Sequence, residues 1–163
     1  MRFICLSFFI LAHLILDAQN VRKTMLRLPD TGETSSYTNT FGEDHDYLIN
    51  PPYFIINGDG TVLDTVTGLM WQQTDGGEMT YENAIQYCKN LRLGSYQDWR
   101  LPNIHESFSI LNHQNSNPAF DIAVFNTTGA EYWWSSDQQV NDSSKIWVSN
   151  AGGGIGNHPQ KET

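Results

Sequence analysis

The chain has 163 residues and a formal net charge of −9 at pH 7, with 18 Asp and Glu against 9 Lys and Arg. Such a surface repels nucleic acid and anionic lipid, which excludes both as partners, and it disfavours sulfated polysaccharides unless the few cations cluster. The aromatic content is high, with 5 Trp, 7 Tyr and 8 Phe, which is typical of a compact extracellular domain with large rings in its core.

The first residues have the pattern of a secretory signal peptide. Arg2 gives a positive start, residues 3–16 are almost unbroken apolar sequence, and Ala18 offers a small residue for cleavage. The apolar run is shorter than the roughly 20 residues that span a membrane, and His13 interrupts it. We therefore expect residues 1–18 to be removed, no membrane insertion afterwards, and a secreted, periplasmic or cell-surface location.

Residues 19–52 are polar and rich in Thr and Ser. They predict an irregular lead-in arm that packs along the domain or is partly disordered. Inside this segment Glu43, Asp44 and Asp46 flank His45, and carboxylate oxygens at this density suit Ca²⁺. A solvated acidic loop is the more common outcome for such a segment, so we expect no cofactor. A calcium site is the alternative interpretation.

The organised domain is predicted to cover residues 53–163 and to begin with β-structure. Residues 53–56, 61–64 and 69–71 are short apolar segments, and the segments between them, at 57–60 and 65–68, are rich in turn-forming residues. Two tight hairpins in succession make a small meander.

Residues 80–91 give the clearest helix signal. Thr80 is a suitable N-cap, and apolar residues recur on one face. The expected inner face consists of Tyr81, Ala84, Ile85, Cys88 and Leu91.

A second, shorter helix is predicted after Pro102. Asn103 can cap it and Glu106 follows three residues later, which is a capping-box arrangement. Arg100, in the connection between the helices, is expected to be a buried anchor that pairs with an acid such as Glu106. The expected inner stripe of this helix is Ile104, Ser107, Phe108 and Leu111.

Two further strands are predicted at residues 132–135 and 146–148, whereas the glycine-rich residues 152–156 indicate a flexible loop. Strands, two helices, a long loop and more strands predict an α+β fold, with two helices packed on a small twisted antiparallel sheet. Alternation along a strand sends Trp133 to one face and Trp134 to the other. Either one ring is exposed for stacking on a sugar or peptide, or both belong to the core. The candidate ligand-binding residues are Trp133, Trp134, Ser135, Ser136, Asp137, Trp147 and Asn150.

No catalytic constellation stands out. Cys88 is the only cysteine left after signal removal, and it lies among apolar residues on the inner face of a helix, without a nearby base. With one cysteine, no intramolecular disulfide can form. The sequence contains no Gly-x-Ser-x-Gly elbow, no paired-His metal helix and no phosphate-binding loop. Structural roles are expected for Trp71, Cys88, Trp99, Arg100 and Glu106.

Several motifs in order resemble the collagen-like adhesin C-terminal (Lcl C-terminal) domain family over about residues 29–162. They are Asn57-Gly58-Asp59-Gly60-Thr61-Val62, Thr67-Gly68-Leu69-Met70-Trp71, the helix through Tyr87-Cys88, Asp98-Trp99-Arg100-Leu101-Pro102, Tyr132-Trp133-Trp134-Ser135-Ser136 and Gly152-Gly153-Gly154. The resemblance implies a C-type-lectin-like fold, related to that of formylglycine-generating proteins. It also implies extracellular adhesion to glycan or protein ligands.

The chain departs from the family pattern at its end. Family members commonly continue into a strand whose cysteine looks like the partner of a residue placed as Cys88 is, whereas this chain stops at Thr163. The resemblance therefore predicts a chain without its last strand, either a shortened product or a fragment, and hence a marginally stable domain.

Three functions are compatible with these features. The leading hypothesis is a non-catalytic surface module that binds a neutral glycan or a protein. The first alternative is an oxidase related to formylglycine generation, whose copper-binding cysteine pair a chain with Cys88 alone cannot supply. The second is a purely structural domain without a ligand of its own. The sequence does not fix the oligomeric state.

Overall fold

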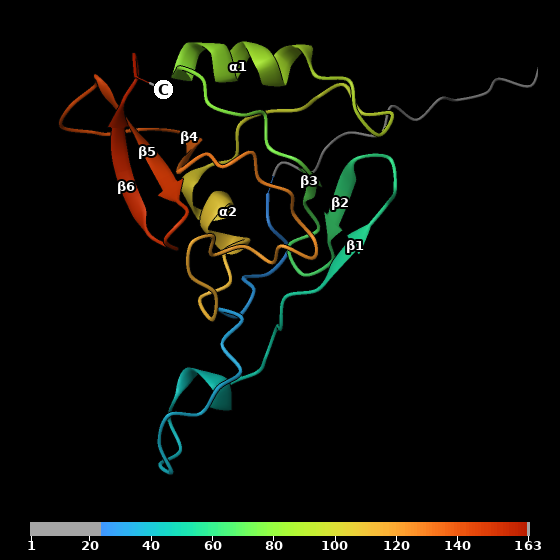
Figure 1. Ribbon diagram of the computed structural model, residues 1–163, viewed down its shortest axis with the longest axis vertical. Coiled ribbons are helices and arrows are strands. Elements are labelled where there is room, and N and C mark those ends of the chain that lie inside the picture. The colour runs from blue at the N-terminus through green and yellow to red at the C-terminus, as the bar shows by residue number, and fades with distance from the viewer. Residues whose placement is uncertain (1–23, 163) are drawn as a thin grey trace, which may run out of the picture.

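The computed structural model describes residues 24–162, so the predicted signal peptide lies outside the described residues. It confirms an α+β fold (Figure 1). The elements are η1 (Asp44–Asp46), β1 (Phe54–Ile56), β2 (Thr61–Asp64), β3 (Met70–Gln72), α1 (Tyr81–Asn90), α2 (Ile104–Ser109), β4 (Tyr132–Gln138), β5 (Lys145–Asn150) and β6 (Ile155–Pro159). Among residues 24–162, no helix is long and apolar enough to cross a membrane.

The strands form two separate antiparallel sheets, which corrects the prediction of a single small sheet. β1, β2 and β3 make one sheet in chain order, and β4, β5 and β6 make the other. The predicted turn at residues 57–60 closes the first hairpin, because the Asp59 carboxylate accepts hydrogen bonds from the N–H and the hydroxyl of Thr61 at 3.0 and 2.6 Å. The Thr61 hydroxyl also lowers the pKa of Asp59 below its ordinary value.

The glycine-rich segment is part of a hairpin, so the prediction of a flexible loop was wrong. The side-chain oxygen of Asn150 accepts hydrogen bonds from the N–H groups of Gly152 and Gly154 at 3.0 and 3.1 Å. Gly153 has φ +90°, a conformation that favours glycine. The chain therefore reverses tightly, and β6 pairs with β5 along its whole length.

α1 begins where the sequence predicts it, since the Thr80 side chain accepts a hydrogen bond from the Asn83 N–H at 3.5 Å. Of its expected inner face only Ala84 is buried. The other members of that face are half-buried, and two of them, Cys88 and Leu91, line a cavity beneath the helix.

α2 begins with the predicted capping box. The side chain of Asn103 accepts a hydrogen bond from the Glu106 N–H, and that of Glu106 accepts one from the Asn103 N–H, both at 2.8 Å. The Glu106 side chain is only 1% exposed, and its two oxygens accept hydrogen bonds from the Arg100 guanidinium at 2.7 and 2.8 Å. The predicted pairing of Arg100 with Glu106 is present, but the Arg100 side chain is 36% exposed, whereas a buried anchor was predicted.

α2 fastens the second sheet to the rest of the domain. The Ile104 N–H donates to the Asp137 carboxylate at 2.7 Å, and the hydroxyls of Ser107 and Ser149 are hydrogen-bonded at 2.6 Å. Both serines are buried. The apolar core next to these contacts is built around Val62, Leu111, Phe120 and Phe125.

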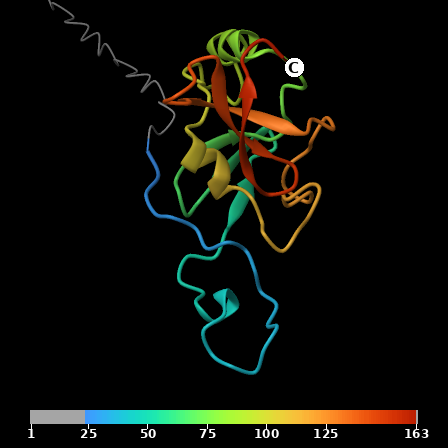
Figure 2. The ribbon, with the colours of Figure 1, turned by 90° about the vertical axis from the view of Figure 1, so that its left-hand side faces the viewer.

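Residues 30–50 form an arm that projects from the body in both views (Figures 1 and 2). Its two ends are joined, because the Asp30 carboxylate accepts hydrogen bonds from the N–H groups of Ile49 and Asn50 at 2.8 Å. The outer part carries exposed rings, with Tyr37 75% and Phe41 74% exposed. The arm packs on the domain only near its base, so the prediction of packing along the domain is only partly correct.

The Arg100–Glu106 pair should dominate local stability. Replacing Glu106 by Gln keeps the size but leaves the Arg100 guanidinium facing a neutral, buried amide. Because the remaining guanidinium is partly exposed, the loss is that of charge-assisted hydrogen bonds, and we expect the free energy of unfolding to fall by about 2 kcal/mol in urea denaturation. The control Glu82→Gln, on the exposed side of α1, should cost less than about 1 kcal/mol. Equal losses in the two variants would contradict a stabilising role of the pair.

Candidate functional site

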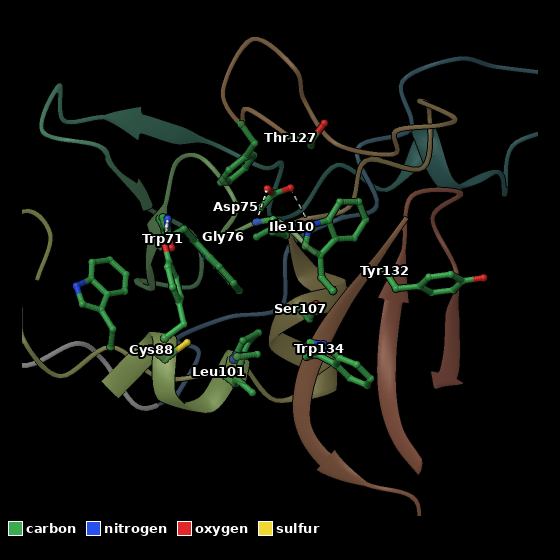
Figure 3. Close-up of a pocket in the computed structure, with 18 of the residues that line it drawn as sticks. Trp71, Asp75, Gly76, Cys88, Leu101, Ser107, Ile110, Thr127, Tyr132 and Trp134 are labelled. Atoms are coloured by element: carbon green, nitrogen blue, oxygen red, sulfur yellow. Dashed lines mark hydrogen bonds between the residues drawn. The ribbon is translucent and has the colours of Figure 1, made fainter. Parts of the chain in front are cut away.

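A half-open cavity of about 310 Å³ lies among β3, α1, α2 and β4 (Figure 3). Most of its wall is apolar, and many of the side chains are aromatic. Among the residues that line it are Met70, Trp71, Asp75, Met79, Ala84, Tyr87, Cys88, Trp99, Arg100, Leu101, Glu106, Ile110, Phe120, Phe125, Glu131, Trp133, Trp134 and His158. Figure 3 shows Trp71 and Cys88 on one side of the cavity and Trp134 on the other.

The first wall comes from α1 and the sheet beside it. Helical spacing places Ala84, Tyr87 and Cys88 on the side of α1 that lines the cavity. The Tyr87 hydroxyl accepts a hydrogen bond from the Gln72 side-chain amide at 2.6 Å. This bond ties α1 to β3 and fixes the Tyr87 ring at the wall.

Two indole rings add to the same side. Trp99 is 8% exposed, and its N–H donates to the Leu93 carbonyl at 3.3 Å. Trp71 is half-buried, and its indole N–H is buried without an acceptor among the described residues. Both rings were predicted to be structural, and both also line the cavity.

The opposite wall comes from β4. The Trp133 ring packs edge-on against Phe120, with ring centroids 4.6 Å apart. Trp134 instead contacts Tyr81 and His158, and its N–H donates to the Met79 carbonyl at 2.8 Å. The different neighbours agree with the predicted alternation. Neither indole ring is fully exposed, and both line the cavity.

Asp75 follows β3 and sits at the edge of the cavity (Figure 3). Its carboxylate accepts hydrogen bonds from the Trp133 indole at 3.2 Å and from the N–H groups of Gly77 and Thr128, the shortest of the latter at 3.1 Å. One carboxylate thus joins the turn after β3 to residues 128–133, more than fifty residues further along the chain.

The remaining candidate ligand residues lie outside the cavity. Ser135 is buried and donates to the Trp147 carbonyl at 2.7 Å, Asp137 accepts from α2, and Asn150 holds the hairpin turn. Ser136 is exposed. Of the seven predicted ligand residues, the structure therefore brings only Trp133 and Trp134 to the cavity.

The carboxylates of the acidic cluster in the arm accept hydrogen bonds from other residues of the arm. The Glu43 carboxylate accepts a hydrogen bond from the Tyr37 N–H at 2.6 Å, the Asp46 carboxylate accepts from the Gly42 N–H at 2.7 Å, and Asp44 accepts from Thr31. The Thr38 hydroxyl and the Tyr37 N–H keep the pKa of Glu43 below its ordinary value. Within residues 24–162, no group of three or more His, Cys, Asp or Glu side chains is placed to hold a metal ion.

Several residues that line the cavity could not be recognised from the sequence. Asp75, Glu131 and His158 come from separate segments, and nothing local connects them. The only usable signal was Asp75-Gly76-Gly77, a polar turn between a strand and a helix. The assembled wall offers aromatic contact surface and few polar groups, which suits non-covalent binding of a small group.

Comparison with known families gives one match. The family model described as the Lcl C-terminal domain matches residues 60–163. No curated protein and no solved structure matches the chain. The matched residues include the whole cavity wall and leave out the arm.

The Cys88 thiol should react slowly. It is free and points from α1 toward the cavity (Figure 3), and burial raises its pKa above the ordinary value. Because the thiolate is the nucleophile, we expect the midpoint of the iodoacetamide alkylation rate against pH to lie above about 8.5. Urea that unfolds the domain should bring the midpoint back to that value. A midpoint below it in the folded protein would show an activated thiol.

Proposed function

The chain belongs to the Lcl C-terminal domain family, and from this premise we propose that it is a secreted or cell-surface recognition module that binds a glycan or protein ligand without catalysis. The observation that carries the proposal is the half-open aromatic cavity. Its volume is within the range of about 300–1,000 Å³ that is usual for small-ligand sites.

The wall suits recognition better than chemistry. Aromatic rings such as Trp71 and Trp134 offer flat faces on which a sugar ring or an apolar side chain can pack. The polar groups nearby already serve the fold, because Glu106 pairs with Arg100 and Asp75 binds residues of the 128–133 segment. The raised pKa of the Cys88 thiol also works against nucleophilic chemistry.

The finer fold assignment belongs to the same proposal. Two short helices beside small antiparallel sheets, joined by long loops, agree with a C-type-lectin-like domain. We propose that this domain covers residues 53–163 and that residues 19–52 form its lead-in. In this division the ligand enters the family domain, and the arm is a separate feature.

The proposal can be tested by filling the cavity. Cys88→Phe places a ring inside it, whereas Gln86→Phe adds the same ring on the exposed side of α1. Both variants and the parent protein would be applied to a glycan array and to a panel of immobilised extracellular matrix proteins. We expect a ligand of the parent protein to be retained by Gln86→Phe and to bind Cys88→Phe at least about tenfold more weakly, which corresponds to roughly 1.4 kcal/mol.

The folded state of each variant is checked by its urea transition. If Cys88→Phe unfolds too easily, Ala84→Leu narrows the same cavity with a smaller side chain. A ligand that binds the parent and both cavity variants equally would place recognition elsewhere on the surface. The absence of any ligand from both panels would favour a purely structural domain.

A further inference from the structure

The cavity is bordered by more negative than positive charge. Asp75, Glu78, Glu106 and Glu131 line it, and among Lys and Arg residues only Arg100 does. Arg100 is engaged by Glu106 through two short hydrogen bonds. Within residues 24–162, Asp75, Glu78 and Glu131 form no ion pair. A ligand that enters therefore meets net negative charge.

Of the three carboxylates without an ion pair, Asp75 is the one held by hydrogen bonds. Its partners are the neutral N–H groups of Trp133, Gly77 and Thr128, which orient the carboxylate without cancelling its charge. Figure 3 shows Asp75 between the Trp71 side and the Trp134 side of the cavity. Both carboxylate oxygens of Asp75 already accept hydrogen bonds. Asp75 therefore attracts a ligand by its negative charge more readily than by accepting a further, well-aligned hydrogen bond.

The aromatic rings of the cavity wall also favour a positively charged ligand. The face of an indole or phenol ring is negative and attracts a cation, most strongly where water is excluded. Trp71, Tyr87 and Trp99 line one side, and Trp133 and Trp134 the other. A quaternary ammonium has no N–H to satisfy and presents apolar methyl groups to such a wall, so it fits better than a primary amine.

We propose that the group bound in the cavity is a quaternary ammonium, of about the size of trimethylammonium, recognised by the aromatic wall and by the charge of Asp75, Glu78 and Glu131. This inference rests on the proposed function, because it names the ligand chemistry of the same cavity. It adds that charge as well as shape determines what the cavity accepts.

The test compares three small ligands by isothermal titration calorimetry at low ionic strength. Choline carries the quaternary ammonium, 3,3-dimethylbutan-1-ol has the same shape without charge, and ethanolamine has the charge without the methyl groups. We expect choline to bind at least about tenfold more tightly than either, and added salt to weaken choline binding but not alcohol binding. The Cys88→Phe variant should lose choline binding.

Charge variants test the carboxylates. Glu78→Gln combined with Glu131→Gln changes two exposed side chains of the rim, and it should weaken choline binding about threefold without changing alcohol binding. Glu82→Gln removes one charge from α1 outside the cavity and serves as the control. Asp75→Asn should have a larger effect, and alcohol binding by that variant reports whether its cavity is intact.

The outcomes separate the two proposals. If the alcohol or ethanolamine binds as tightly as choline, and Cys88→Phe abolishes that binding, the ammonium inference is overturned and the recognition cavity stands. If none of the three binds while a ligand from the panels still depends on the cavity, the ammonium inference is likewise overturned. If the small ligands and both panels all fail, the proposed function fails with it.

Discussion

A carboxylate removed from water needs both countercharge and hydrogen-bond donors, and Glu106 obtains them from the Arg100 guanidinium and the Asn103 N–H. This pairing fixes the point at which the connection after α1 turns into α2. From there α2 holds the second sheet through Ser107 and Ser149. Arg100 and Glu106 also line the cavity. The spacing between the two cavity walls therefore depends on one ion pair, in which the carboxylate is buried and the guanidinium is partly exposed.

Short-range signals made much of the fold predictable from the sequence. Thr80 and the Asn103–Glu106 box mark helix starts because a cap satisfies N–H groups only a few residues away. β6 was not predicted because Ile155–Pro159 lacks apolar alternation, and its strand conformation comes from pairing with β5. The division into two sheets depends on which strands pair, and residue patterns do not encode that locally.

The sequence predicted individual residues of the cavity wall but not the cavity itself. Large apolar residues such as Trp71 and Trp99 are expected in the core whatever their context, and they do lie beside the core. Whether the space between them is filled or open depends on the packing of several elements, and the sequence does not show it. Conversely, Ser135 and Asp137 were predicted to meet a ligand, and they hydrogen-bond to the protein's own backbone instead. Small polar side chains near strand and helix ends commonly do so.

The projecting arm determines where a protease would first cut this protein. Among the described residues, the hydrogen bonds of the tip, from Ser36 to Gly42, all stay inside the arm. Exposed tips of this kind are preferred cleavage sites. The hydrogen bonds from the N–H groups of Ile49 and Asn50 to the Asp30 carboxylate lie at the base, so a nick in the tip leaves them in place. Cleavage would thus interrupt the arm and leave the residues around the cavity unchanged.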